Sequence, residues 1–275
     1  LGVPIVVTLQ GDDIFLDSLP PDYRDKAIQL ARELVSHVDA FIVFSQFYAD
    51  FMAEYFAIPP DKIHQVPLGI KTDDFAHNTR ADESSQAVVY LARLGPEKGL
   101  HVLVDAFMLL RKQPEHSNLK LRIAGWLGKQ NDAFVKEKFQ RLDAAGLAGE
   151  YEYLGTVDRQ QKLDFLQQID VLSVPTVYRE PKGLFVLEAL AAGVPVVQPA
   201  HGAFPELIEK TGGGILCQPG SPEDLARCLS QLLTDSTQRN LYGTRGRKNV
   251  LAGFNADQMA ERTLDVYRNF ISIEP

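Results

Sequence analysis

The sequence has 275 residues, of which 45% are hydrophobic and 23% are charged. These values are typical of folded domains, and the length allows one large or two modest hydrophobic cores. The formal net charge of -8 excludes nucleic acid as the main partner, because phosphate backbones are bound by clustered Lys and Arg side chains. The longest apolar run, near residues 184–197, contains Glu188 and Pro195 and is too short and too charged to span a membrane, so no transmembrane segment is predicted.

The cysteines and the first residues favour a reduced, cytoplasmic protein. Cys217 and Cys228 are the only two cysteines, and they lack the spacing of metal ligands. Residues 1–9 lack the basic start and the cleavage site of a signal peptide and read as a strand inside a domain. The adjacent acids at 12–13 and 73–74 have no fixed third ligand, so neither a metal nor another cofactor is expected.

Short β-branched runs alternate with helical patterns along the chain. Because most of these runs are apolar throughout, helices are expected to cover both faces of the sheet that they form, as in parallel sheets. Helices with one apolar face are predicted over residues 100–112 and 222–233. The clearest strands are predicted over residues 4–8, 40–45, 87–92, 119–124, 171–174 and 194–197.

This order of elements predicts an α/β fold with two Rossmann-like domains. The polar segment 76–86 is the best candidate for a linker and places the boundary near residue 80. Residues 1–80 hold about two strand–helix units and are expected to form a partial domain, whereas residues 81–253 hold about six, enough for a complete, parallel, doubly wound sheet. Residues 254–275 contain a last amphipathic helix, over 256–271, that can pack on either domain.

The most informative stretch is VLSVPTVYREPKGLFVLE, residues 171–188, in which a loop joins a buried strand to a helix. Ligands of open α/β sheets bind at the carboxyl ends of strands, where Glu180 lies. The backbone amides of Gly183 and Leu184 can bind an anion at the start of the helix, and Glu188 can hold paired hydroxyls. The alternative is two solvated acids, but Glu188 has only apolar neighbours in LFVLEALAAGVPVV, where a free charge is costly to bury.

A second strand–loop–helix stretch, VVYLARLGPEKGL at residues 88–100, carries Arg93 and Lys98 in its loop. Two cations in such a loop can clamp a diphosphate, the arginine by its planar fork and the lysine as a point charge. The alternative is a turn at Gly95 and Pro96 with ordinary surface charges, which composition alone favours.

Six segments in a fixed order extend these observations: ARLGPEKGLHVLVDAF, LRIAG, YLGTV, IDVLSVPT, EPKGLFVLEALAAGVPVV and GAFPELI. In order and spacing they resemble the retaining, GT-B-fold glycosyltransferases called glycosyl transferases group 1. A weaker resemblance in VPIVVTLQGDD, VDAFIVFSQF and KIHQVPLGIKTDDF extends the match to nearly the whole chain. It implies a hexosyltransferase that moves a sugar from a UDP- or GDP-sugar to a hydroxyl of a sugar, polysaccharide or lipid-linked acceptor, with retention of configuration.

The resemblance also implies a role for each candidate residue. Glu180 and Gln10 are the implied catalytic residues at the donor sugar. The other implied contacts are those of Arg93, Lys98, Gly183 and Leu184 with the diphosphate, of Glu188 with the ribose and of Val157 with the base.

The chain departs from the family pattern at two positions. The family often has His where the chain has Gln10, and Phe where it has Lys182, and the chain is expected to begin part-way through the N-terminal domain. Because Gln10 cannot act as an acid or base at neutral pH, a nucleotide-sugar-binding module without turnover is an alternative. A nucleotide-sugar epimerase of the same two-domain architecture is a further alternative. Peripheral membrane contact stays open, although no polybasic helix is present.

Overall fold

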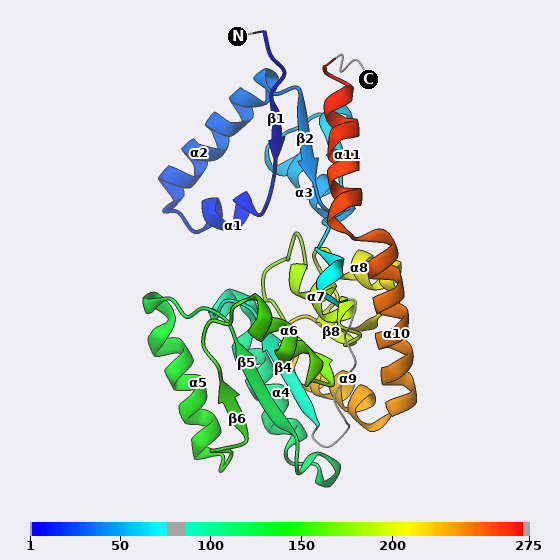
Figure 1. The fold of residues 1–275 in the computed structure, drawn as a ribbon. Helices are drawn as coiled ribbons and strands as arrows, with labels where there is room; N and C mark the ends of the chain where they lie inside the picture. The colour runs from blue at the N-terminus through cyan, green and yellow to red at the C-terminus, as the bar shows by residue number, and fades with distance from the viewer. Residues whose placement is uncertain (1, 76–85, 272–275) are drawn as a thin grey trace.

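A computed structural model describes residues 2–75 and 86–271 of the protein. These residues form two α/β units, one above the other in Figure 1, and each unit is built on a parallel sheet. The boundary predicted near residue 80, and most of the predicted linker, lie outside the described residues. Within the described part of the chain, no helix is both long and apolar enough to cross a bilayer.

The N-terminal unit holds three parallel strands in the order β1-β2-β3, where about two strand–helix units are predicted. The additional strand is β3 (Ile63–Gln65), whose sequence IHQ is half-buried and has no apolar run that could have revealed it. The other strands and the helices are β1 (Val6–Thr8), α1 (Asp12–Asp17), α2 (Pro21–Leu34), β2 (Ala40–Val43) and α3 (Gln46–Tyr55).

The C-terminal unit holds six parallel strands in the order β6-β5-β4-β7-β8-β9. The central strand β4 (Ala87–Leu91) is buried at every position, as its unbroken apolar sequence predicts. The other strands are β5 (Lys120–Ala124), β6 (Tyr151–Tyr153), β7 (Val171–Leu172), β8 (Val196–Pro199) and β9 (Gly214–Cys217). The helices are α4 (Leu100–Leu110), α5 (Asp132–Ala144), α6 (Arg159–Gln167), α7 (Leu184–Ala191), α8 (Phe204–Thr211), α9 (Pro222–Thr234) and α10 (Ser236–Gly253).

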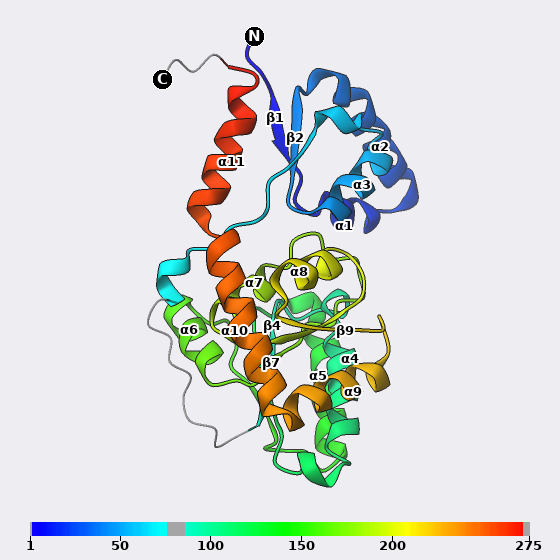
Figure 2. The same ribbon diagram turned by 90° about the vertical axis from the view of Figure 1, so that its right-hand side faces the viewer.

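The last helix, α11 (Ala256–Arg268), continues from α10 back to the N-terminal unit (Figure 2). Val266 packs in one hydrophobic cluster with Ala40 and Ile42 of β2 and with Val66. A backbone bridge between Ile70 and Asn255 joins the two connections where they pass side by side. The sequence left open which domain this last helix packs on. In the structure it covers the N-terminal sheet.

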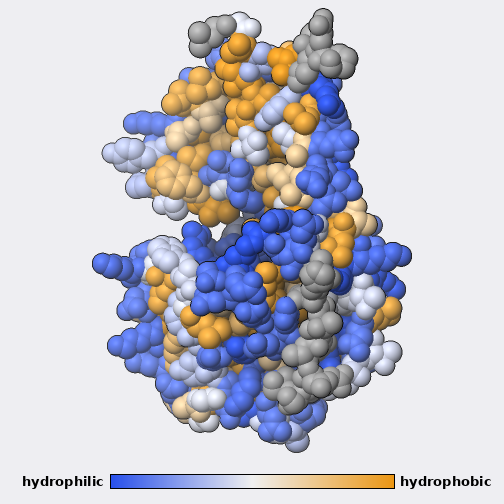
Figure 3. Space-filling view, viewed as in Figure 1, coloured by the Kyte–Doolittle hydropathy of each residue, from blue (hydrophilic) through white to orange (hydrophobic). Residues whose placement is uncertain are grey.

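In the space-filling view of Figure 3 the surface is hollowed between the two units. Hydrophilic residues predominate on the C-terminal unit at this hollow, whereas the N-terminal unit shows more hydrophobic surface. The loops that follow β4 and β7 rise from the C-terminal sheet toward the other unit, so the hollow lies where parallel α/β sheets bind ligands.

Candidate functional site

The two loops singled out from the sequence follow neighbouring strands, because β4 and β7 pair in parallel. The amide of Val177 donates a hydrogen bond to the Glu97 carbonyl at 3.0 Å and joins the loops directly. Gly99 has a φ of +74°, and a Cβ built on it would lie 1.7 Å from the Pro175 carbonyl oxygen. Only glycine allows the loops to approach this closely, and the approach carries the neighbouring Lys98 to the second loop.

Glu180 is the centre of the resulting cluster and is only 4% exposed. Its Oε2 accepts from Lys98 Nζ at 2.8 Å and from the hydroxyl of Tyr178. Its Oε1 faces the backbone amides of Lys182 and Gly183, each at 3.3 Å. The carboxylate is therefore held by donors on both oxygens at the start of α7, where helix geometry leaves amides without intrahelical partners.

Charges and hydrogen bonds fix the protonation states of this cluster. Burial by itself would raise the pKa of Glu180. The charge and hydrogen bond of Lys98, together with the hydrogen bonds from the Tyr178 hydroxyl and the Gly183 amide, bring this pKa below its usual 4.5. Burial and the negative charge of Glu180 raise the pKa of Tyr178 far above its ordinary value. At neutral pH, Glu180 is therefore a carboxylate and Tyr178 a neutral hydroxyl donor.

Glu188 lies one helical turn after Leu184 on α7, and both line a pocket of about 170 Å³. The Glu188 carboxylate pairs with Lys162 of α6 at 2.5 Å, and Arg159 of the same helix pairs with Asp74. The sequence around Glu188 is apolar, and its counter-ion comes from a different helix. The pocket is lined by Gly69, Ile70, Lys71, Asp74, Phe75, Arg159, Lys162, Leu163, Leu184 and Glu188.

Arg93 and Val157 lie in the loops that follow β4 and β6. Arg93 is half-exposed, and its Nη2 pairs with Glu97 Oε1 at 3.0 Å. Its charge acts on Tyr178, although among the described residues neither Arg93 nor Glu188 makes a hydrogen bond or ion pair with Glu180. Val157 is partly buried against the C-terminal core in the loop between β6 and α6.

The N-terminal unit touches the loop that carries Glu180. Gln10 follows β1, and its Oε1 accepts from Lys182 Nζ at 3.2 Å, so the two departures from the family pattern contact each other. The hydroxyl of Ser45 donates to the Pro181 carbonyl at 3.2 Å. The structure thus brings Lys98, Glu180, Lys182 and Gln10 together and leaves Glu188 in the adjoining pocket.

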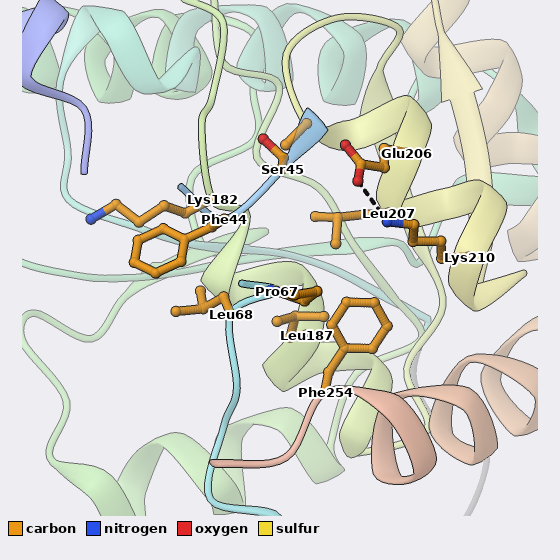
Figure 4. A pocket seen from close by; sticks show the side chains of 11 residues that line it. Phe44, Ser45, Pro67, Leu68, Lys182, Leu187, Glu206, Leu207, Lys210 and Phe254 are labelled. Carbon is orange, nitrogen blue, oxygen red and sulfur yellow. Dashed lines mark hydrogen bonds and ion pairs between the residues drawn. The ribbon is translucent and has the colours of Figure 1, made fainter. Parts of the chain in front are cut away.

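Sequence reasoning missed Tyr178, Lys162 and Glu206. Glu206 lies in the first turn of α8, where its Oε2 accepts from the amide of Gln46 at 2.8 Å and its Oε1 from Gln65 Nε2 at 2.7 Å and Lys210 Nζ at 2.6 Å. Figure 4 shows Glu206 and Lys210 beside a pocket lined by both units. The motif GAFPELI contains Glu206, but acids are common in the first turn of helices, so its sequence position did not single it out.

Solved structures of two α/β domains resemble this fold along nearly the whole chain. HepE of Anabaena, in complex with UDP and glucose, has a TM-score of 0.81 at 20% identity over 97% of this chain and 72% of that one. Sucrose-phosphate synthase of Thermosynechococcus elongatus has a TM-score of 0.81 at 20% identity over 98% and 68% of the two chains. The predicted GT-B-type fold with two Rossmann-like domains is confirmed.

Family comparisons then place the chain within this fold class. Residues 71–249 match the family Glycosyl transferases group 1, and residues 1–74 match Glycosyltransferase Family 4. The chain belongs to the glycosyl transferases group 1 family.

Among curated relatives, an uncharacterized glycosyltransferase of Methanocaldococcus jannaschii is 29% identical over 78% of this chain and 55% of its own length. A glycogen synthase of Mycobacterium tuberculosis is also 29% identical, over 85% of this chain and 55% of its own length. The chain thus spans little more than half the length of these relatives.

Proposed function

We propose that the protein acts as a retaining glycosyltransferase that takes a sugar from a UDP- or GDP-sugar and transfers it to a hydroxyl acceptor. The observation that carries this proposal is the buried pair of Lys98 and Glu180 at the start of α7. A cation and a carboxylate at one helix N-terminus offer matched partners for a diphosphate and for sugar hydroxyls. The family membership and the relatives named as glycosyltransferases support the same class of reaction.

The donor diphosphate is proposed to bind between Lys98, Arg93 and the first amides of α7, those of Gly183 and Leu184. These groups supply positive charge without a metal, and no metal or other cofactor is part of the proposal. Among the described residues, no cluster of three His, Cys, Asp or Glu side chains is arranged to hold a metal ion. The solved HepE structure with UDP and glucose shows that a protein of this fold binds such a nucleotide.

The nucleoside is proposed to occupy the adjoining pocket, with Glu188 on the ribose and the loop of Val157 against the base. Glu188 is paired with Lys162, yet a carboxylate has further lone pairs that can accept from ribose hydroxyls. The acceptor, a sugar, polysaccharide or lipid-linked hydroxyl, is proposed to enter from the side of Gln10. Cys217 and Cys228 are free thiols, which suits the proposed cytoplasmic location.

The proposed reaction depends on charge stabilisation, with no covalent enzyme intermediate. The acceptor oxygen forms a bond to the anomeric carbon on the face from which the phosphate oxygen departs. The electron pair of the broken bond leaves with the diphosphate, and the acceptor proton passes to a diphosphate oxygen. Lys98 and Arg93 stabilise the growing negative charge, and the ionised Glu180 orients the sugar.

Calorimetry with UDP and GDP at millimolar concentration tests this proposal. Lys98→Met and Arg93→Met are each expected to weaken binding about ten-fold or more, because each removes a hydrogen-bonding charge from the diphosphate. Lys136→Met is the control, since Lys136 is exposed on α5, outside the two loops. Circular dichroism checks folding, and the half-exposed Arg93 provides a variant that leaves no buried charge unpaired. Binding of neither nucleotide, or equal losses in the control, would contradict the proposal.

A binding module without turnover is a second candidate, because Gln10 has no proton to exchange at neutral pH. Transfer or hydrolysis of the donor, followed by mass spectrometry, would exclude this candidate. An epimerase is disfavoured by the family match over residues 71–249, and it would form an epimer of the donor without an acceptor.

A further inference from the structure

Lys182 is a partly buried cation with an incomplete set of partners. Its Nζ donates to the neutral amide oxygen of Gln10 at 3.2 Å and lies 6.0 Å from the ring centre of Phe44. Within residues 2–75 and 86–271, no carboxylate forms an ion pair with Lys182 within 4.0 Å, whereas Lys98 and Lys162 each have one. A desolvated charge without a counter-ion is unfavourable unless a ligand supplies it.

The acids around Lys182 are already engaged by other donors. Glu180 is held by Lys98, Tyr178 and backbone amides. Asp12 accepts from the amide of Gln10 at 2.8 Å, and Asp13 accepts from the hydroxyl of Tyr48 at 2.7 Å. Burial lowers the pKa of Lys182, and the positive charge of Lys98 lowers this pKa further. The negative charges of Glu180 and Asp12 raise it, but the net result is a lowered pKa. The neighbouring acids therefore do not compensate for the burial of this ammonium group.

The position of Lys182 relative to Glu180 and Glu188 indicates which part of a bound donor it would contact. The backbone amide of Lys182 faces Glu180, which is proposed to hold the donor sugar, whereas the nucleoside is proposed to lie in the pocket of Glu188. The Lys182 ammonium lies on the side of Glu180 that faces the N-terminal unit, where Gln10 meets it. Gln10 also carries an amide group that can donate to an anion held by the lysine.

We propose that Lys182 and Gln10 form a carboxylate subsite, so that the donor is a nucleoside diphosphate sugar of the hexuronic acid class. This inference rests on the proposed function and adds the chemistry of the sugar to it. The ammonium forms the ion pair with the sugar carboxylate, and the Gln10 amide donates a second hydrogen bond. A sugar with a neutral hydroxymethyl group would leave the ammonium with neutral acceptors only, which is the weaker arrangement.

Calorimetry with UDP, UDP-glucose and UDP-glucuronic acid measures the preference for an acidic sugar. If GDP is the nucleotide that binds, GDP-mannose and GDP-mannuronic acid are compared instead. The acidic sugar nucleotide is expected to bind about ten-fold tighter than its neutral counterpart. Lys182→Met should bring the ratio of the two affinities near one, and Lys182→Arg should retain most of the preference. Lys136→Met, at an exposed position on α5, should leave the ratio as it is in the wild type.

The outcomes separate this inference from the function on which it rests. Binding of UDP or GDP without preference for the acidic sugar overturns the carboxylate subsite and leaves the glycosyltransferase proposal standing. A preference that survives Lys182→Met also overturns the subsite. If neither UDP nor GDP binds, both the proposed function and the carboxylate subsite are contradicted.

Discussion

The negative charge of Glu180 lies among donors that favour it, and the folded protein therefore holds this carboxyl at a pKa below the 4.5 of an exposed glutamate. The stability that the ionised form contributes is present above the unfolded pKa and is lost as the pH falls through the folded one. Glu180→Gln is expected to lower the free energy of unfolding at neutral pH by about 3 kcal/mol, because it leaves Lys98 buried without its counter-ion.

Urea unfolding at about pH 7 and about pH 4 measures this difference for the wild type and for Glu180→Gln. The gap between the two proteins should shrink in acid, because the Glu180 carboxyl takes up a proton more readily in the unfolded wild type than in the folded protein, where its pKa is lowered. Glu209→Gln is the control, because Glu209 is exposed on α8. A gap that stays constant, or widens in acid, would show that the charge of Glu180 is not stabilised as described.

The residue types at the site followed from the sequence, but their pairings did not. Glu180 and Lys98 were singled out separately because each lies on a loop between an apolar strand and a helix. Their 2.8 Å ion pair depends on how two loops pack, which no local pattern encodes. The pair of Glu188 and Lys162 joins two different helices for the same reason. Tyr178 belongs to no pattern of charge or periodicity, so it was missed.

The packing of the secondary-structure elements depends on Gly99 where the loops that follow β4 and β7 meet. Gly99→Ala is expected to destabilise the protein by about 3 kcal/mol or more, since it adds a methyl group 1.7 Å from the Pro175 carbonyl oxygen to the strain of a left-handed backbone. Gly149→Ala is a matched control, because Gly149 has a φ of +82° and open space around its Cβ position. This control should lose only about 1–2 kcal/mol.

Thermal and urea unfolding of both variants give the comparison. The difference between them isolates the close approach of the loops from the backbone conformation. Gly99→Ala should also weaken the proposed binding of UDP or GDP, because the displaced loop carries Lys98. Equal losses of stability in the two variants would mean that the loops can separate without penalty.

Strands were predictable where burial on both faces made the sequence apolar throughout, as in β2 and β4. Two strands at sheet edges, β3 and β6, which each pair on one side only, were not predicted. The sequence of β6, YEY, alternates a half-buried tyrosine with an exposed glutamate over three residues, too few for a periodic signal. Strand ends moved by a few residues as well: the run 171–174 is a strand only over Val171–Leu172.

Across the whole molecule, Glu206 links the two units through the amide of Gln46 and the side chain of Gln65. Glu206→Ala is expected to loosen the arrangement, with a small loss of stability of about 1 kcal/mol and a larger radius of gyration in small-angle X-ray scattering. Glu206→Gln should restore much of the wild-type scattering, because an amide oxygen can still accept from Gln46. Glu209→Ala, on the same helix, should scatter like the wild type. A Glu206→Ala variant as compact as the wild type would mean that other contacts suffice.

The return of α11 to the N-terminal sheet also bears on how the protein is made. During translation, β1 and β2 leave the ribosome long before Val266 is synthesised. This valine nevertheless shares a hydrophobic cluster with Ala40 and Ile42. The nascent N-terminal sheet therefore has an uncovered apolar face while the whole C-terminal unit is synthesised, and during that interval it is exposed to chaperones and to aggregation.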